Sequence, residues 1–179
     1  MSAHGESIWI VSFWLAFVRL WQGDPSGAER ELRPAYDALK RIGERSHFSS
    51  IARELSNVVF LQGRYDEAEQ LTRECEESSR PNDVHSQILW RSTRAKVLAH
   101  KGDLEAAEEL ARVSVALASE SDFYPAHADA LMDLGHVLEV GGESDAAALA
   151  VQEAIRFYKL KGNLAQLERA HTVLAYLRA

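Results

Sequence analysis

The chain has 179 residues, of which 46% are hydrophobic and 26% charged, so it is long enough for one domain or a short repeat array and too apolar for wholesale disorder. A formal charge of −7 and a pI near 5.5 argue against nonspecific binding to nucleic acid, which requires concentrated Lys and Arg. The one cysteine, Cys75, excludes an internal disulfide and predicts a reducing, cytoplasmic location, with Cys75 as a buried packing residue rather than a catalytic thiol.

The first predicted element is a helix that contains the apolar stretch IWIVSFWLAFVRLW at 8–21. As a helix this stretch is about 21 Å long, shorter than the roughly 30 Å hydrocarbon core of a bilayer. The residues before it lack the basic region of a signal peptide and contain Glu6 instead. We therefore expect a buried helix and no contact with a membrane.

Large apolar residues surround this first helix on every side. A terminal helix of that kind needs a second neighbour, which is either a preceding repeat or another copy of the chain. The sequence leaves both possibilities open: a repeat that precedes this helix, or self-association as a homodimer through the N-terminal helix. The residues expected at that contact are Trp9, Phe13, Trp14, Phe17 and Trp21.

Turn signals rich in Gly, Pro, Ser, Asn and Asp divide the chain into about nine helices. No segment alternates with a period of two, so no strand is expected and the fold class is all-α. The expected helices are 6–22, 25–42, 47–62, 65–79, 84–101, 104–120, 124–140, 144–161 and 164–177.

Four glycines, Gly23, Gly63, Gly102 and Gly142, recur at separations of 40, 39 and 40 residues and end the first helix of each hairpin. Glycine adopts a positive φ at a helix C-terminus without strain. The acid or serine that follows each glycine can cap or charge the next helix. These residues are Asp24, Asp66, Asp103 and Ser144.

Small residues recur in the same register. They stand five residues after each glycine, twelve after it and seven before it, and small side chains at these sites let paired helices cross closely. The three sets are Ala28, Ala68, Ala107 and Ala147; Ala35, Cys75, Ser114 and Ala154; and Ala16, Ser56, Ala95 and Gly135.

With this pattern the chain resembles a tetratricopeptide repeat (TPR) array, whose second half-motif is seen as Gly63-Arg64-Tyr65-Asp66-Glu67-Ala68. The period of about 40 exceeds the family's 34, and the family's tryptophan position holds Ser12, Ala52, Arg91 and Leu131. The resemblance implies a right-handed superhelix of antiparallel hairpins, as one domain over 1–179. Its hairpins are 6–42, 47–79, 84–120 and 124–161, with a capping helix at 164–177.

The run 91–163 is also similar to the C-terminal repeat region of bacterial signalling proteins that carry a nucleotide cyclase or DNA-binding module and a regulatory ATPase. This resemblance implies that the chain is a fragment or a stand-alone relative of such a protein. The sequence has no Gly-x-x-x-x-Gly-Lys-Ser/Thr loop, so ATPase chemistry is not expected in this chain.

Candidate chemistry is confined to Asp129, Asp133 and His136, which share one face of a helix at spacings i, i+4 and i+7. Metal binding or acid–base catalysis could use such a face. One helix rarely supplies enough ligands, however, and no second set has matching spacing, so we interpret the three residues as a polar stripe facing a groove. We expect no metal, no cofactor and no enzymatic activity.

In TPR arrays the first helix of each hairpin lines the concave side, and the resemblance implies that positions ten and six residues before each glycine point inward. Carboxylate-clamping members of the family carry basic residues and asparagine there, which implies binding of an acidic peptide tail. The predicted partner-binding groove consists of Arg53, Asn57, Arg91, Ser92, Lys96, Met132 and His136.

The function predicted from these features is noncatalytic: recognition of a peptide or partner domain within a bacterial signalling or transcription-regulating system. The alternative is a small-molecule sensor that regulates an attached cyclase, ATPase or DNA-binding module. An enzyme built on helices is the third hypothesis, with Asp129 and His136 as its only candidates.

Overall fold

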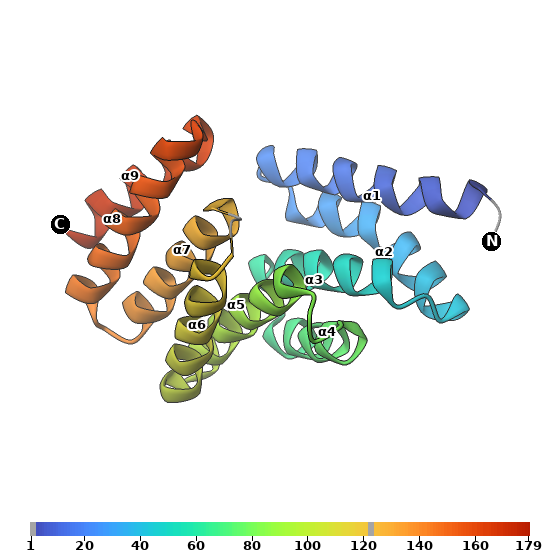
Figure 1. Ribbon diagram of the computed structural model, residues 1–179, viewed down its shortest axis with the longest axis horizontal. Coiled ribbons are helices and arrows are strands. Elements are labelled where there is room, and N and C mark those ends of the chain that lie inside the picture. The colour runs from blue at the N-terminus through green and yellow to red at the C-terminus, as the bar shows by residue number, and fades with distance from the viewer. Residues whose placement is uncertain (1–2, 122–123) are drawn as a thin grey trace. The chain divides into compact units, whose positions relative to one another are not determined.

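The computed structural model of the chain describes residues 3–121 and 124–179, and within them it has nine helices and no strand (Figure 1). The all-α prediction is confirmed, and every predicted helix end lies within three residues of the observed one. The helices are α1 (Ala3–Trp21), α2 (Pro25–Ile42), α3 (Ser46–Leu61), α4 (Tyr65–Ser78), α5 (Val84–Lys101), α6 (Leu104–Ser119), α7 (Tyr124–Val140), α8 (Ser144–Lys161) and α9 (Leu164–Leu177).

The helices form two compact units, Met1–Pro81 and Asn82–Ala179, called the first and second unit below. Within each unit every helix packs against the next one along the chain. In addition α1 contacts α3, and α5 packs against α7, so the first helices of neighbouring hairpins touch. This is the packing of stacked helical hairpins. The expectation of a single domain stays a prediction.

All four repeat glycines adopt the left-handed conformation that the sequence predicted, with φ of 72°, 75°, 90° and 83° at Gly23, Gly63, Gly102 and Gly142. The turn at Gly102 shows the hydrogen bonds. The N–H of Gly102 donates to the carbonyl of Ala99 at 3.1 Å, and that of Asp103 donates to the carbonyl of Leu98 at 3.0 Å. These two bonds satisfy carbonyls that the helix end would otherwise leave unpaired.

The predicted helix caps are confirmed at two of the four repeats. The side chains of Asp24 and Asp103 accept hydrogen bonds from the backbone N–H groups of Gly27 and Ala106. Asp66 lies inside the first turn of α4, where its charge favours the helix N-terminus. Ser144 is not a cap, because α8 begins at this residue and Glu143 precedes it without a side-chain capping bond.

All three columns of small residues are buried between helices. The Ala column that follows the glycines is fully buried at every repeat, and every member of the other two columns is buried as well. A larger side chain at any of these sites would force the paired helices apart. The predicted reason for the repeat, close helix crossing, is therefore confirmed.

Helix α9 covers the end of the second unit as a cap. Ala170 is fully buried, and Leu167, Val173, Leu174 and Leu177 pack against the core of α7 and α8. Leu164, the first residue of α9, is 75% exposed.

Candidate functional site

The clearest candidate site is a cluster of polar side chains in the second unit, where α5 meets α7. The ammonium nitrogen Nζ of Lys96 lies 2.9 Å from Oδ1 of Asp133. One turn further along both helices, Nε2 of His100 and Nε2 of His136 are 2.9 Å apart, so one imidazole donates a hydrogen bond and the other accepts it. The two pairs join neighbouring hairpins through polar rather than apolar contacts.

Asp129 extends the cluster by one turn of α7 and contacts α8. The hydroxyl of Tyr158 donates a hydrogen bond of 2.5 Å to Oδ1 of Asp129. Burial raises the pKa of Asp129 to about 6, and the hydrogen bond from Tyr158 reverses only part of that effect. Burial and the neighbouring carboxylate of Asp129 also raise the pKa of the Tyr158 hydroxyl.

The imidazole of His136 is neutral over the physiological pH range. Burial lowers its pKa to about 4, and the positive charge of Lys96 and the ring of His100 act in the same direction, while the carboxylate of Asp133 opposes them. Arg169 on α9 acts electrostatically on both Asp129 and His136. At neutral pH the cluster therefore holds two cations, Lys96 and Arg169, and the carboxylates of Asp129 and Asp133, and Oε2 of a third carboxylate, Glu139, lies 3.8 Å from Nδ1 of the neutral His136 ring.

These groups, which we call the α5–α7 cluster, comprise residues from four helices. They are Lys96 and His100 from α5, Asp129, Asp133 and His136 from α7, Tyr158 from α8 and Arg169 from α9. The sequence predicted the α7 stripe and Lys96. It missed the other members, because their contact with the stripe depends on helix packing. Within the described residues no group of His, Cys, Asp and Glu has the geometry of a metal site.

Several residues of the predicted groove do not join this cluster. Ser92 is 2% exposed, and its Oγ lies 2.8 Å from Oγ of Ser114, so it belongs to the packing of α5 on α6. Met132 packs against the core of α8 and α9. Arg91 bonds Gln87 and lies over the ring of Trp90, with Cζ 4.1 Å from the ring centroid. Arg91 and Lys96 are five residues apart on α5, so their side chains point in directions that differ by about 140° around the helix axis.

The first unit contributes the other two predicted groove residues, Arg53 and Asn57, which share one face of α3. Arg53 is 7% exposed, and its Nη2 lies 2.6 Å from Oε1 of Glu54. Asn57 is partly buried. The guanidinium of Arg53 is thus already neutralised by a neighbouring carboxylate, unlike the clamp that the resemblance implied.

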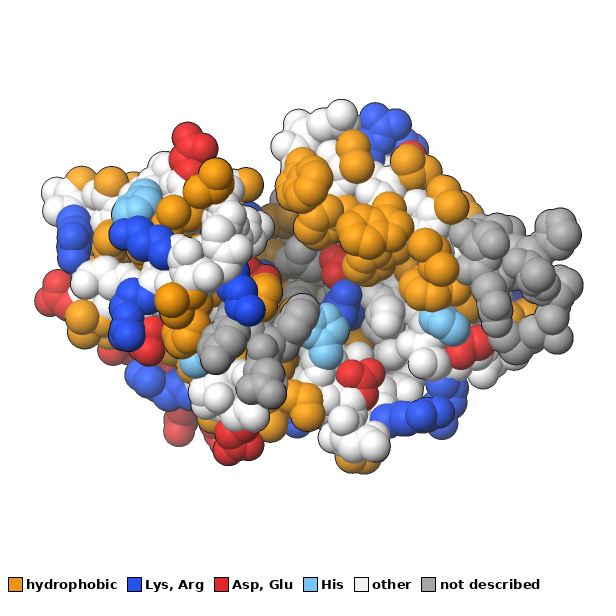
Figure 2. All heavy atoms as spheres, turned by 45° about the horizontal axis from the view of Figure 1, so that its top comes forward, with side chains coloured by type: hydrophobic (Ala, Val, Ile, Leu, Met, Phe, Trp, Pro, Cys, Tyr) orange, Lys and Arg blue, Asp and Glu red, His pale blue; other side chains and the backbone are white. Residues whose placement is uncertain are grey.

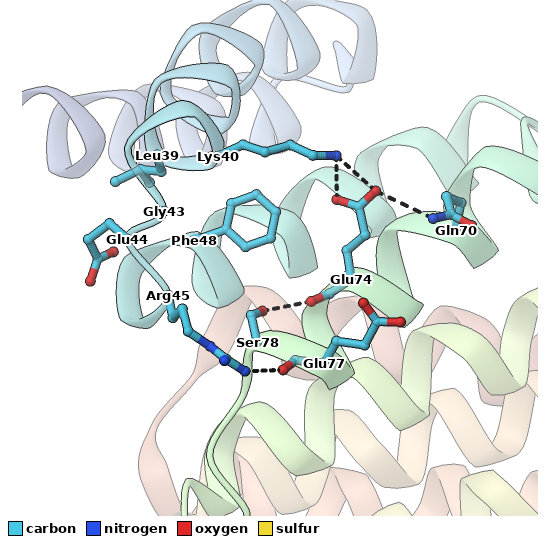
Figure 3. Close-up of a pocket in the computed structure, with 10 residues that line it drawn as sticks. All are labelled: Leu39, Lys40, Gly43, Glu44, Arg45, Phe48, Gln70, Glu74, Glu77 and Ser78. Atoms are coloured by element: carbon cyan, nitrogen blue, oxygen red, sulfur yellow. Dashed lines mark hydrogen bonds and ion pairs between the residues drawn. The ribbon is translucent and has the colours of Figure 1, made fainter.

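A pocket of about 490 Å³ lies in the first unit, between the C-terminal ends of α2 and α4 and the start of α3 (Figure 3). The ring of Phe48 forms its apolar wall. Lys40 reaches across to Glu74, with Nζ 3.0 Å from Oε2, and Arg45 donates a hydrogen bond to the backbone carbonyl of Glu77. The carboxylate of Glu44, which precedes α3, accepts a hydrogen bond from the backbone N–H of His47 at 2.8 Å. No sequence feature indicated this pocket.

The aromatic residues of α1 divide between two environments. The ring of Trp9 stacks on His47 of α3 with centroids 4.2 Å apart, and Phe13 and Phe17 are partly buried. Trp14 and Trp21 are 61% and 70% exposed. Hydrophobic side chains form a continuous patch on this part of the surface (Figure 2). The predicted self-association residues therefore include two that point to solvent and three that mainly pack within the unit.

Two other sequence-based expectations can be compared with the structure. Cys75 is fully buried, and its Sγ donates to the carbonyl of Ser49 at 3.3 Å, as expected of a packing residue. In the described part of the chain, none of the helices has the length and hydropathy needed to cross a bilayer.

No protein-family model matches the sequence, and no curated protein matches it at a significant level. Solved structures do resemble the fold. A kinesin light chain-type protein from Podosopora anserina, with nearly identical TPR-like repeats, aligns over 99% of this chain and 98% of its own, with a TM-score of 0.64 and 14% identity.

Two further structures are similar. BtubC (BKLC) from P. vanneervenii aligns over 92% of this chain and 77% of its own, with a TM-score of 0.59 and 17% identity. MamA from Desulfovibrio magneticus RS-1, residues 41 to the end, aligns over 99% and 97%, with a TM-score of 0.53 and 16% identity. At these identities the likeness concerns the fold alone. The chain therefore has the fold of a tetratricopeptide-like helical repeat array.

Proposed function

We propose that the chain is a noncatalytic protein-interaction module, and that the α5–α7 cluster of the second unit binds an acidic segment of a partner protein. Lys96 is the residue that contacts the partner carboxylate. Stacked hairpins of this fold place the first helices side by side, which suits an extended or helical segment laid across them.

The observation that carries this proposal is the placement of Lys96. Its side chain is only 12% exposed, and its ammonium group is held beside Asp133. Charged groups at such depth cost free energy that an apolar residue would not, and clusters of groups with displaced pKa values mark functional sites more often than random surface does. For folding alone, a nonpolar side chain at residue 96 would cost less free energy than the lysine does.

An acidic rather than a basic partner is favoured by the titration of Asp129. Because its pKa is near 6, this carboxyl group takes up a proton easily when a second negative charge approaches. The cluster then keeps its two cations, Lys96 and Arg169, beside the carboxylates of Asp133 and Glu139. Binding of an acidic segment should therefore be coupled to proton uptake and should strengthen as the pH falls from about 7.5 to 5.5.

The test begins with selection of peptides from an unbiased display library on the intact chain at pH 6. The affinity of a selected peptide is then measured by calorimetry for the wild type, Lys96→Gln, Asp129→Asn and the matched control Lys159→Gln, an exposed lysine on α8. We expect Lys96→Gln to weaken binding at least tenfold and Lys159→Gln to leave it unchanged. Asp129→Asn should strengthen binding at pH 7.5 and remove the pH dependence.

Equal affinities for Lys96→Gln and Lys159→Gln would show that the peptide binds elsewhere. Because Lys96→Gln leaves the carboxylate of Asp133 without its cation, the melting temperature of each variant is recorded beside its affinity. The affinity of Asp133→Asn for the same peptide is a second, independent test. If a partner carboxylate displaces Asp133 from Lys96, removal of that internal competitor strengthens binding.

The alternative function, a small-molecule sensor, is favoured by one observation, the pocket in the first unit. Its volume of about 490 Å³ is typical of a small-ligand site, and its lining holds three carboxylic acids, Glu44, Glu74 and Glu77, against two basic residues, Lys40 and Arg45. A small organic cation is the ligand class that suits it. A thermal-shift series with arginine, putrescine and spermidine tests this idea. A rise in melting temperature that Phe48→Ala or Glu77→Gln removes would support it.

The regulatory setting implied by the sequence resemblance, attachment to a cyclase, ATPase or DNA-binding module in a bacterial signalling system, stays a prediction. The reading frame and neighbouring genes around this sequence test it directly. An encoded cyclase or ATPase module preceding the repeats would support the regulatory setting, and its absence would favour a stand-alone adaptor.

A further inference from the structure

From Ile10 to Trp21 the outer side of α1 is an apolar face, distinct from the surface used in the proposed function (Figure 2). With 100° of rotation per residue, its exposed side chains cover an arc of about 140°, while the opposite side of the helix packs on α2 and α3. The face, called the α1 face below, consists of Ile10, Val11, Trp14, Leu15, Val18 and Trp21, each between 42% and 70% exposed.

Within this face a line of four residues has the spacing of a helix–helix contact. Val11, Trp14, Val18 and Trp21 are separated by three, four and three residues, which keeps them in one line along the helix as in the apolar positions of a coiled coil. The line also alternates small and large side chains. A helix that packs against this line should place a large side chain opposite each valine and a small one opposite each tryptophan.

We propose that the occupant is a second copy of the chain, whose α1 lies antiparallel to this one about a twofold axis at the level of residue 16. In that arrangement each residue of one α1 faces the residue of the other α1 whose number brings the sum of the two to 32. Val11 then faces Trp21 of the second copy, and Trp14 faces its Val18, so that each large ring meets a small side chain. A parallel pair would set each tryptophan against its own equivalent and hold the helices apart.

Area and charge both agree with a pair of identical copies. The six exposed side chains offer on the order of 600 Å² per copy, so pairing buries roughly 1,200 Å², the lower limit of specific interfaces. The one charged residue between 9 and 21, Arg19, lies toward α2, with Nε 3.7 Å from Oε1 of Glu31. Between residues 9 and 21, therefore, no like charges of α1 oppose each other across the axis, and a dimer with a dissociation constant in the micromolar range is expected.

The first experiment measures the mass of the intact chain by sedimentation equilibrium over a concentration series. The double variant Trp14→Glu/Val18→Glu places like charges opposite each other and should raise the dissociation constant about 100-fold. Trp14→Glu/Val18→Lys changes the same exposed sites but sets opposite charges against each other, so it should dimerise at least tenfold more tightly than the first variant. A wild type that stays monomeric throughout, or two variants that behave alike, would overturn the proposal.

The second experiment tests the antiparallel register by disulfide formation. In the proposed dimer residue 21 faces residue 11 of the second copy. The two copies of residue 21 are therefore ten residues, or about 15 Å, apart along the helix axis. Trp21→Cys alone should not crosslink, whereas a mixture of Val11→Cys and Trp21→Cys should. Native Cys75 is fully buried and the wild type is the control. Crosslinking of Trp21→Cys with itself contradicts this register.

A lipid surface is the competing occupant, because exposed tryptophans on an apolar helix face also suit the membrane interface. Flotation with phosphatidylcholine vesicles separates the two cases. Failure to float together with a concentration-dependent mass supports the dimer. Flotation of a chain that is monomeric in solution overturns it, and neither result depends on the α5–α7 cluster.

Discussion

Gly135 of α7 lies against Val151 of α8 so closely that a Cβ atom on the glycine would stand 2.9 Å from Cγ2 of the valine. Val151 is fully buried and β-branched, so its methyl group has no low-energy rotamer into which to move. The backbones of these two helices therefore approach each other because one residue has no side chain. The same repeat position holds Ala16, Ser56 and Ala95 in the earlier hairpins.

Gly135→Ala should lower the free energy of unfolding by about 1–2 kcal/mol, because the clash exceeds the roughly 1 kcal/mol that alanine contributes to helix propensity. Urea denaturation followed by circular dichroism measures this change. Val151→Ala should remove most of the clash, so the double variant Gly135→Ala/Val151→Ala should be more stable than the sum of the single effects predicts. Strict additivity would show that the two residues do not interfere.

Asp129→Asn should raise the free energy of unfolding at pH 7 by about 1–3 kcal/mol. Burial raises the folded-state pKa of Asp129 to about 6, above its ordinary value of 3.8. A raised carboxyl pKa means that the folded chain holds a proton that the unfolded chain has lost. The contribution of Asp129 to stability thus declines as the pH rises from about 4 to about 6. Asparagine can still accept the hydrogen bond from Tyr158 and carries no charge.

Urea denaturation of the wild type and Asp129→Asn at several pH values between 3.5 and 7.5 tests this expectation. The two proteins should converge near pH 3.5 and separate above pH 4. Glu109→Gln, which changes an exposed carboxylate on α6, is the control and should follow the wild type. A variant less stable than the wild type at pH 7 would contradict the sign of the effect.

Glu29→Gln should destabilise the first unit by about 1–3 kcal/mol at neutral pH. Burial would raise the pKa of Glu29, but hydrogen bonds from Arg33, Gln62 and Arg64 outweigh it and lower the pKa to about 2. The carboxylate accepts from Gln62 at 2.8 Å and from Arg64 at 2.7 Å, and so joins α2 to the connection between α3 and α4.

A lowered carboxyl pKa contributes stability that is fully present above the unfolded value, near 4.5, and is lost as the pH falls toward 2. The difference between the wild type and Glu29→Gln should therefore be largest above pH 5 and should nearly vanish at pH 2. Asp37→Asn, at an exposed site on the same helix, is the matched control. A difference that is independent of pH would rule out this account.

Ser114→Ala should destabilise the second unit by about 1–2 kcal/mol, because it removes two buried hydrogen bonds at once. Ser114 donates to the carbonyl of Ile88 at 2.8 Å, so its oxygen accepts the hydroxyl proton of Ser92 at 2.8 Å. Ser119→Ala, on the exposed side of the same helix, should cost less than 0.5 kcal/mol, roughly the scale of a surface change. Thermal unfolding compares Ser114→Ala with Ser119→Ala, and equal effects would show that the two buried hydrogen bonds of Ser114 do not stabilise the second unit.

The helix boundaries and turns were predictable from the sequence because their causes are local. A glycine such as Gly102 ends a helix through its own φ angle, and an aspartate such as Asp103 caps the next helix within three residues. The error at Ser144 has a local cause as well. The helix begins at this residue itself, which leaves its side chain one position too late to cap.

The candidate site was predictable only in part. Counting back six residues from the glycines indicated Lys96 and His136, and the structure places both residues in the α5–α7 cluster. Counting back ten indicated Arg53, Ser92 and Met132, which the structure shows in packing contacts or beside an internal carboxylate. The two sets of positions are four residues apart, so their side chains point in directions that differ by about 40° around the helix axis. That difference is enough to turn a side chain from a groove into a helix contact.

The sequence by itself determined where the helices begin and end and where they touch, because φ angle, capping and side-chain size belong to single residues. Only the tertiary structure decided which polar groups share an environment. Tyr158 meets Asp129 across 29 residues and His100 meets His136 across 36. The pKa of Asp129 depends on burial among those neighbours, and burial arises only when hairpins stack. The same packing decided which side of α1 stays exposed.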